Sequence, residues 1–265
     1  MEFLVPVGRA TLASLAYLGG LTQLALRAAY HAVVAPFRGK PLRLGRAMHQ
    51  AMAVGVEALP ILSLISFFIG VILALQGAYE LRKFGALNYV SSAVAISMTR
   101  ELGPLITAIV VIGRSGSAFA AEIGTMKVTE EIDALETMAV DPVQFLVTPK
   151  FLAMALMLPC LTTWADMMGV FGGALFGVSS AGFTFQRYIG STFDALVLRD
   201  VYTGLIKSVM FGMTITAVGC YEGFRTGAGA EQVGRSTTAA VVMSIFLVIA
   251  VDLVFTALFY FLGGK

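Results

Sequence analysis

Five ionisable residues lie inside long apolar stretches of this sequence: Arg100, Glu101, Asp166, Lys207 and Asp252. An ionised group at the centre of a bilayer costs about 2.5–3.5 kcal/mol even on the lenient insertion scale, so it normally faces a partner or a hydrated cavity. Two arrangements fit two cations and three anions. The charges form ion pairs that hold helices together, or they form a polar patch that contacts a lipid headgroup or lines a watery cavity.

The elements that carry these charges are predicted to be membrane spans. A helix that rises about 1.5 Å per residue needs roughly 20 mainly apolar residues to cross a hydrocarbon core about 30 Å thick. Five stretches meet this requirement: Ala58–Tyr79, Tyr89–Gly113, Phe151–Ala181, Val201–Tyr221 and Thr237–Leu262. Counted along these helices, all five charges lie in one layer, roughly 18–24 Å from the cytosolic ends. The sequence therefore predicts an all-α integral membrane protein. Gln76 lies slightly above the charged layer and is a candidate to join it, and Tyr79 is a candidate that also suits an interfacial anchor.

Composition excludes several classes of protein. Hydrophobic residues make up 58% of the 265 residues and charged residues only 13%, which excludes an ordinary soluble domain. Cys160 and Cys220 both lie in apolar runs, so neither a disulfide scaffold nor a Cys/His metal cluster is expected. The formal net charge is +2 and the basic residues are dispersed, so no nucleic-acid partner is expected.

Basic residues in the loops predict the orientation, because short loops rich in Lys and Arg stay in the cytoplasm. With the N-terminus inside, eleven basic residues are cytoplasmic and five are on the outer side. The inner group is Arg9, Arg27, Arg38, Lys40, Arg43, Arg46, Arg114, Lys127, Lys150, Arg225 and Arg235. The outer group is Arg82, Lys83, Arg187, Arg199 and Lys265. The N-terminus is therefore expected in the cytoplasm and the C-terminus in the periplasm.

The segment before the first span has two interpretations. Ala10–Leu26 is apolar but short, so it is either a sixth span or a helix in the headgroup layer. The basic residues that interrupt residues 1–50 favour the interfacial helix. A cleaved signal peptide is not expected, because no basic n-region precedes the apolar part. We therefore expect a single domain over residues 1–265, with an interfacial segment over residues 1–50 and a transmembrane bundle over 51–265.

Small residues recur at helical spacing in two places. Gly169, Gly173 and Gly177 lie on one helix face, and Gly116, Ala120 and Gly124 repeat that spacing. Such ridges let two backbones approach closely. Contact within one chain is the first interpretation of each ridge, and a homodimer interface is the alternative.

A polar segment, Arg114–Lys150, is predicted to be a cytosolic loop that contains a short amphipathic helix. Thr129 is the expected N-cap, Ile132, Leu135 and Met138 recur on one face, and Asp141-Pro142 ends the helix. Thr148-Pro149 is expected to begin the next helix. The short helix either docks a cytosolic partner or packs on its own bundle.

Motifs in this part of the chain resemble those of the MlaE family of ABC-transporter permeases. They are Arg100-Glu101-Leu102-Gly103-Pro104, Gly113-Arg114-Ser115-Gly116-Ser117, Ala121-Glu122-Ile123-Gly124-Thr125-Met126-Lys127-Val128-Thr129-Glu130, and Ile132-Asp133-Ala134-Leu135 through Val140-Asp141-Pro142. The likeness is dense over residues 97–150. It continues more loosely through Lys207-Ser208, Gly223-Phe224 and Thr237-Thr238 to Asp252.

The resemblance implies a homodimeric permease with five spans per chain, bound to a dimer of cytosolic ABC ATPase subunits that bind ATP and Mg. It also implies a periplasmic lipid-binding hexamer of the mammalian-cell-entry type, and phospholipid as cargo in the inner membrane of a Gram-negative cell. The coupling helix would lie within Glu122–Met138. Its candidate ATPase-coupling residues are Glu122, Lys127, Glu130, Glu131, Asp133, Leu135 and Met138.

The sequence contains no phosphate-binding loop of the form G-x-x-x-x-G-K-[ST], so the chain is expected to hold no cofactor and to rely on its partner for ATP hydrolysis. The leading hypothesis is a lipid-transporting permease. Its candidate lipid-pocket residues are Leu73, Gln76, Tyr79, Arg100, Glu101, Lys207 and Asp252. Two alternatives remain open: an ion- or proton-coupled carrier with Glu101, Asp166 and Asp252 as a relay, and a membrane scaffold without transport.

Overall fold

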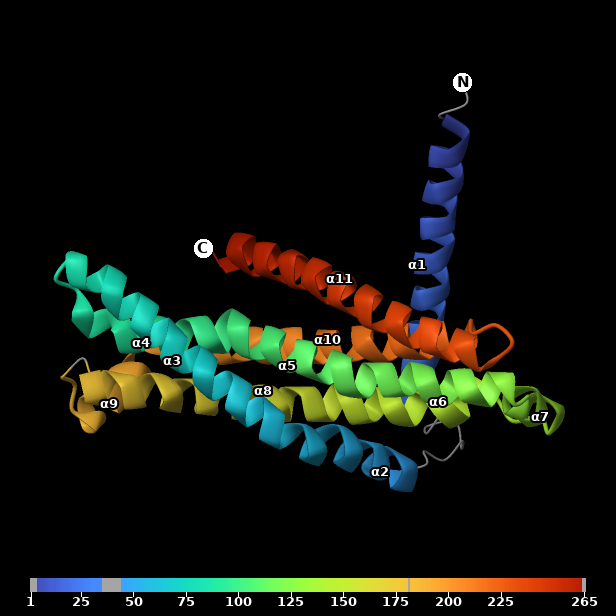
Figure 1. The fold of residues 1–265 in the computed structure, drawn as a ribbon, viewed down its shortest axis with the longest axis horizontal. Coiled ribbons are helices and arrows are strands. Elements are labelled where there is room, and N and C mark those ends of the chain that lie inside the picture. Colours follow the sequence, from blue (N-terminus) through green and yellow to red (C-terminus); the bar gives the residue numbers. More distant parts are fainter. Residues whose placement is uncertain (1–3, 35–43, 181, 264–265) are drawn as a thin grey trace. The chain divides into compact units, whose positions relative to one another are not determined.

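The computed structural model describes residues 4–34, 44–180 and 182–263, and within these residues every regular element is a helix (Figure 1). Five helical segments are long and apolar enough to cross a membrane. They are Gly45–Lys83, Leu87–Val128, Val143–Ser179, Leu198–Phe224 and Ala230–Phe261. The predicted five-span, all-α membrane protein is confirmed.

Contacts divide the chain into two compact units, which are described separately. Unit 1 comprises residues 1–50, 115–153 and 213–244, and unit 2 comprises residues 51–114, 154–212 and 245–265. Helices α8 (Thr148–Ser180), α10 (Leu198–Phe224) and α11 (Ala230–Gly263) contribute residues to both units. The expectation of one domain over the whole chain stays a prediction.

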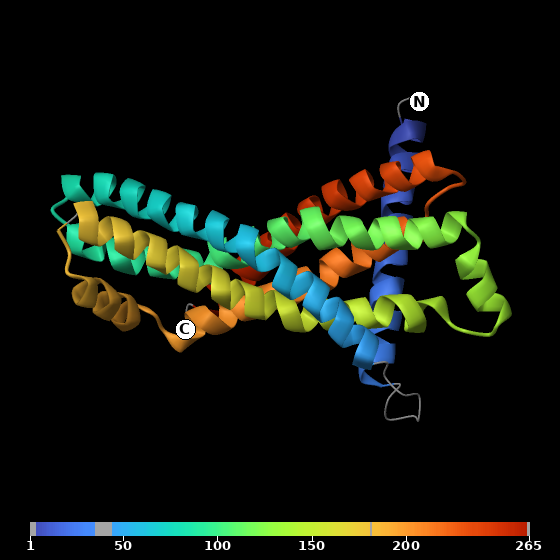
Figure 2. The same ribbon diagram turned by 60° about the horizontal axis from the view of Figure 1, so that its bottom comes forward.

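Unit 2 is built around α3 (Leu59–Lys83), α4 (Val90–Ser97), α5 (Gly103–Val111), α9 (Phe185–Ala195) and parts of α8, α10 and α11. α4 packs on both α3 and α9, as Figures 1 and 2 show. A Cβ atom on Gly70 or on Gly172 would overlap the backbone of the facing helix, α8 or α3 respectively. The approach of these two helices therefore depends on residues without a side chain.

The first small-residue ridge is an intrachain contact. Gly169 faces Gly70 and Met98, while Gly173 and Gly177 face Tyr188 of α9. Tyr188 is 1% exposed, and burial raises the pKa of its phenol to about 12. The glycines thus make room for a large side chain that holds α9 against the bundle.

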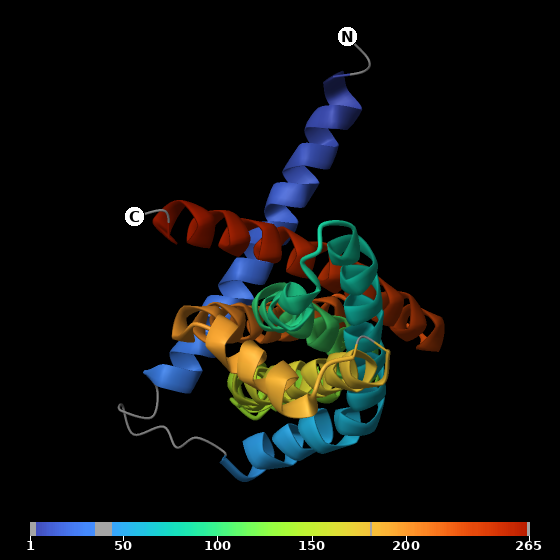
Figure 3. The same ribbon diagram turned by 90° about the vertical axis from the view of Figure 1, so that its left-hand side faces the viewer.

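Unit 1 contains α1 (Leu4–Val33), most of α2 (Leu44–Gly55), α6 (Ser117–Val128), α7 (Glu131–Thr137) and the remaining parts of α8, α10 and α11. α1 crosses the part of α10 that belongs to this unit (Figures 2 and 3). Gly20 lies against Tyr221, and the rings of Tyr17 and Tyr221 meet edge to face with centroids 5.1 Å apart. Burial raises the pKa of the Tyr17 phenol. Within the described residues, α1 is long enough to span but is not among the helices that are also apolar enough, and the interfacial interpretation stays a prediction.

The second small-residue ridge also packs within the chain. Gly219 of α10 faces the carbonyl of Gly116, and Gly223 faces Ala120 and Ile123 of α6. Gly124 faces Thr226. These contacts explain why α6 is a helix, although the sequence places its residues in a loop.

The predicted boundaries of the Arg114–Lys150 loop are therefore wrong. Helix continues through α6 to Val128, and it resumes at Val143 in a π-helical turn that leads into α8. The small polar residues of α6 lower its hydropathy, but they pack closely on α10 and keep their backbone hydrogen bonds within a helix. α8 runs without a break through Pro159.

The predicted N-cap role of Thr129 is wrong. Thr129 ends α6, and its hydroxyl lies 3.0 Å from the Thr125 carbonyl oxygen. α8 begins at Thr148 as expected, but Thr148 does not cap a free helix start, because the π-helical turn Val143–Val147 precedes it. Asp141 caps that turn, since its Oδ1 atom accepts a hydrogen bond of 2.8 Å from the Val143 amide. A carboxylate in that position satisfies one of the free N–H groups of a helix start.

Candidate functional site

A buried lysine organises the charged residues of unit 2. Lys207 of α10 is 1% exposed, and its Nζ atom lies 2.5 Å from Glu101 Oε2 and 2.9 Å from Asp252 Oδ1. It also donates a hydrogen bond of 2.7 Å to Thr256 Oγ1. Two hydrogen bonds, to Glu101 and Thr256, and the nearby Asp252 carboxylate offset the cost of removing the ammonium group from water. The predicted ion pairs exist for these three charged residues.

Glu101 is placed by an irregular turn of the second span. Residues Met98–Leu102 form a π-helical turn, and Gly103 and Pro104 begin the α-helix that follows. Proline suits this position because the first residues of a helix have no intrahelical partner for their N–H groups. The Glu101 side chain remains 41% exposed, so one face of the carboxylate is open.

Arg100 pairs with a residue outside the five charges that the sequence analysis singled out. Its guanidinium lies 2.6 Å from Oδ1 of Asp200, whose side chain is 2% exposed. The second carboxylate oxygen of Asp200 accepts a hydrogen bond of 3.2 Å from the Val197 amide. The sequence analysis missed Asp200 because the fourth span was predicted to begin at Val201. An acidic residue in the first turn of a helix was the available signal.

The five charges do not form one connected cluster, and their common depth stays a prediction. Asp166 of α8 makes no ion pair with the residues that the structure describes, and its Oδ1 atom lacks a hydrogen-bond partner there. It faces Gly103 instead. The five charges form a triad around Lys207, a pair between Arg100 and Asp200, and a separate aspartate. Side chains can pair only where helices bring them within reach, and equal depth along a helix does not decide that.

A cavity of about 340 Å³ opens beside the triad and the Arg100–Asp200 pair. Its lining residues come from the second span, α10 and α11: Arg100, Glu101, Arg199, Asp200, Thr203, Lys207, Thr256, Phe259 and Tyr260. Arg199 donates a hydrogen bond of 2.9 Å to the Phe259 carbonyl, which ties the start of α10 to the end of α11. The cavity has charged groups of both signs beside two aromatic rings, an arrangement that suits an amphiphile.

The three candidates on α3 do not line this cavity. Leu73 is half-buried, while Gln76 and Tyr79 are exposed. The Lys83 ammonium lies 4.4 Å from the centre of the Tyr79 ring, at the end of α3. Their assignment to a lipid pocket stays a prediction.

In unit 1, α7 is held by only part of its predicted apolar face. Ile132 and Leu135 are 3% and 9% exposed, but Met138 is 64% exposed. Met138 does not continue the face of Ile132 and Leu135, because α7 ends at Thr137 and Ala139 adopts a positive φ of 57°, which turns the chain away. Its assignment as a coupling residue stays a prediction. Glu130, with φ 61°, forms the other boundary. Left-handed residues other than glycine are uncommon, and they define both ends of α7 sharply.

Three of the candidate coupling residues make ion pairs within unit 1. Glu122 accepts two hydrogen bonds of 2.8 Å from Lys150, which is 2% exposed, and Lys127 lies 2.8 Å from Asp133. Glu130 and Glu131 are exposed. α7 thus presents acidic side chains and Met138 outward, while Ile132 and Leu135 are buried and α7 packs on α6.

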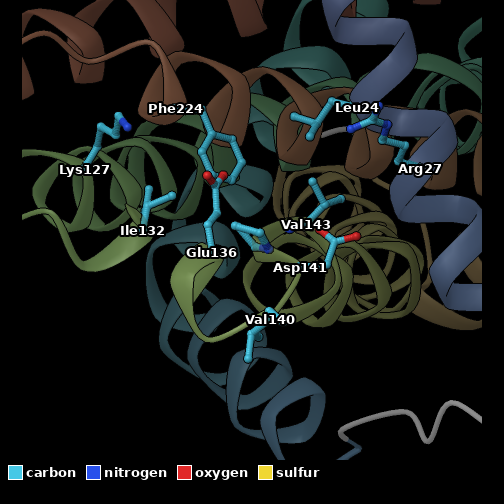
Figure 4. A pocket seen from close by; sticks show the side chains of 11 residues that line it. Leu24, Arg27, Lys127, Ile132, Glu136, Val140, Asp141, Val143 and Phe224 are labelled. Carbon is cyan, nitrogen blue, oxygen red and sulfur yellow. Dashed lines mark hydrogen bonds between the residues drawn. The ribbon is translucent and has the colours of Figure 1, made fainter. Parts of the chain in front are cut away.

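A second cavity, of about 610 Å³, lies beside α7 within unit 1. Figure 4 shows the Glu136 carboxylate pointing toward the Phe224 ring, with Lys127 on one side and Arg27 of α1 on the other. Asp141 also lines this cavity, and its Oδ2 atom lies 3.2 Å from Nε2 of His31 of α1. Asp141 therefore links α1 to the start of the helix that leads into α8.

The family model described as Permease MlaE matches residues 47–258. The chain belongs to the MlaE permease family. The matched residues include every candidate lipid-pocket and coupling residue, and all of α7. The family resemblance seen in the motifs around Glu101 and Glu122 is confirmed.

Several relatives of this MlaE-family permease match over most of its length. A probable ABC transporter permease protein of Rickettsia typhi is 42% identical over 220 residues, which cover 83% of this chain and 85% of the relative. The intermembrane phospholipid transport system permease protein MlaE of Haemophilus influenzae is 35% identical, over 81% of this chain and 82% of the relative. The chloroplastic protein TRIGALACTOSYLDIACYLGLYCEROL 1 of Arabidopsis thaliana is 37% identical, over 80% of this chain and 61% of the relative. This chain is a multi-pass ABC transporter permease.

Proposed function

We propose that this permease moves phospholipid between the inner membrane and the periplasmic side of a Gram-negative envelope. The observation that carries the proposal is the cavity of unit 2, where charged residues of both signs line a space between membrane-spanning helices. A phospholipid headgroup carries charges that such residues recognise, and its acyl chains suit the surrounding apolar surface. The name of the Haemophilus influenzae relative, a phospholipid transport permease, supports the same cargo.

Energy in this proposal comes from a separate ATPase that binds ATP and Mg. The chain has no phosphate-binding loop, and its Rickettsia typhi relative is named a probable ABC transporter permease. α7 would dock into the ATPase through its exposed side chains, since Ile132 and Leu135 are used to hold it on α6. The coupling residues on the outside of α7 would be Glu130, Glu131 and Met138, with Glu122, Lys127, Asp133 and Leu135 supporting them from within unit 1.

The proposed assembly contains two copies of the permease, two ATPase subunits and a periplasmic lipid-binding hexamer of the mammalian-cell-entry type. The N-terminus would be cytoplasmic and the C-terminus periplasmic, which agrees with eleven basic residues on the inner side and five on the outer. α1 would then lie in the inner headgroup layer.

The test uses the complex purified with its ATPase and reconstituted in lipid nanodiscs. We expect phospholipid to be retained and to stimulate ATP hydrolysis. Glu101→Gln keeps the shape of the side chain but removes its charge beside Lys207, so lipid retention and lipid-stimulated hydrolysis should both fall several-fold. Glu80→Gln, at an exposed ion pair with Lys83, is the matched control and should leave both unchanged.

Mass spectrometry of the retained lipids and a melting curve accompany both variants. The proposal is contradicted if the wild-type complex retains no phospholipid, or if Glu101→Gln keeps full lipid-stimulated hydrolysis. Flux that follows an ion gradient without any ATPase would instead support the alternative of an ion- or proton-coupled carrier.

A further inference from the structure

Helix α9 of unit 2 has an apolar stripe that the packing of the bundle does not use. Its inner face carries Tyr188 and Thr192, which are 1% and 3% exposed. Phe185, Ile189 and Phe193 follow one another at intervals of four residues, so they form a second stripe along one side of the helix. Phe185 is 52% exposed and Phe193 is 72% exposed.

The polar residues of α9 lie on a third side. At about 100° per residue, Arg187 and Asp194 point away from both the packing face and the phenylalanine stripe. The Arg187 side chain donates a hydrogen bond of 3.2 Å to Asn88, in the connection between α3 and α4. Helix α9 therefore has three sides: one packs against the rest of unit 2, one is apolar and one is polar. An apolar stripe on the outer surface would not stabilise the helix if that surface contacted only water.

The stripe continues into a membrane span. Leu198, where α10 begins, is only five positions after Phe193, and an extended chain of five steps covers at most about 18 Å. Val197, Leu198 and Tyr202 are 60%, 74% and 61% exposed, so large exposed apolar side chains follow the stripe into the start of α10. Exposed tyrosines at the ends of the other spans in unit 2, Tyr79 and Tyr260, are typical of the boundary between membrane and water.

We propose that the Phe185–Ile189–Phe193 stripe of α9 inserts into the headgroup layer of the membrane and contacts lipid. Arg187 and Arg199 on adjoining surface would lie near lipid phosphates. Insertion would also fix the rim of the unit 2 cavity at the depth of the headgroups, because the segment after α9 is hydrogen-bonded to the cavity wall. The Val197 amide donates to Asp200, and Asp200 pairs with Arg100 in the cavity wall.

The experiment exploits the single tryptophan of the chain, Trp164. In a Trp164→Phe background, Phe193→Trp places a fluorophore on the stripe, and Asp194→Trp places one at the same depth on the polar side. Both are studied in the complete transporter complex, reconstituted in phosphatidylcholine vesicles with and without lipids that carry a spin label near the headgroup.

We expect the labelled lipid to quench Phe193→Trp several-fold more than Asp194→Trp, and aqueous iodide to quench them in the opposite order. Emission of Phe193→Trp should also lie at shorter wavelength. Equal quenching of both positions by iodide, without lipid quenching, would overturn the proposal. Protection of Phe193→Trp from both quenchers would overturn it too, because a protein surface or a second copy would then cover the stripe. If Phe193→Trp lowers the folded yield, Phe185→Trp tests the same stripe. None of these readouts depends on transport, so the proposed function can fail independently.

Discussion

At the scale of single residues, Lys207 shows how a membrane protein holds a charge in its interior. The ammonium group contacts Glu101, Asp252 and Thr256, and it is almost completely buried. Removing it leaves two carboxylates facing each other with no counter-charge. The penalty for leaving a buried charge without its partner exceeds the net gain from forming the pair.

We therefore expect Lys207→Met to reduce the free energy of unfolding by about 3–5 kcal/mol, the range for breaking one side of a buried pair. Lys83→Met removes the lysine of the exposed ion pair with Glu80 and should change the free energy of unfolding by about 0–1 kcal/mol. Denaturation of the detergent-solubilised chain measures both. Equal stability of the two variants would show that the triad does not hold the bundle.

A second residue, Asp141, joins two elements of unit 1. It caps the helix that starts at Val143 and pairs with His31 of α1. We expect Asp141→Ala to cost about 0.5–2 kcal/mol, the usual range for a lost N-cap. Asp194→Ala, on the exposed side of α9, should stay within about 0.5 kcal/mol of the wild type. Thermal melting compares them, and a neutral Asp141→Ala would refute the capping role.

At the scale of elements, the pairing of α3 and α8 depends on which glycine faces the other backbone. Gly70 meets the backbone of Gly169, whereas Gly77, two turns further along α3, has only a Val90 methyl 4.0 Å from where its Cβ would lie. Spacing shows that both glycines are in one helix, but only the packed structure distinguishes them.

Gly70→Ala should therefore destabilise the chain by at least about 1–3 kcal/mol, because rigid backbone must move. Gly77→Ala should be neutral, or stabilising by up to about 1 kcal/mol through helix propensity. Folded yield and melting temperature in the same detergent provide the comparison. Similar losses for both variants would mean that the close approach is not the cause.

Helix α7 has buried side chains on one side, and exposed side chains on the other side and at its C-terminal end. Met138 is 64% exposed, so Met138→Ser should weaken binding of the partner ATPase while leaving the melting temperature unchanged. Met167→Ser, at a methionine of α8 that is 61% exposed in unit 2, is the matched control and should not affect ATPase binding. Pull-down of the ATPase by each variant is the measurement. If both variants bind as wild type does, Met138 takes no part in docking.

At the scale of the whole molecule, the five spans differ in how much of their surface one chain covers. The third span is the most buried, while the first and the fifth leave most of their surface uncovered. Such surfaces contact lipid or another chain. The ATPases of ABC transporters act in pairs, so we expect two permeases in each complex.

Native mass spectrometry of the complex extracted with its lipids tests this expectation. The permease should contribute twice its mass of 28.1 kDa, together with two ATPase subunits. A complex with one copy of each would contradict the proposed dimer.

The sequence by itself determined the five membrane spans, the family and most of the candidate residues. Hydropathy over about 20 residues is a local property, and the motifs around Glu101 and Glu122 are contiguous, so neither needs knowledge of tertiary contacts. The sequence also showed that charges inside the spans require partners.

Only the tertiary structure decided which partners they have. Arg100 pairs with Asp200, a residue 100 positions away, and Asp166 stands apart from the triad although it was placed at the same depth. The tertiary structure also showed that α6 is a helix because its small residues pack on α10, and that the turn at Ala139 exposes Met138. Depth along a helix follows from counting residues, but contact depends on the rotation and closeness of helices, which packing between distant segments sets.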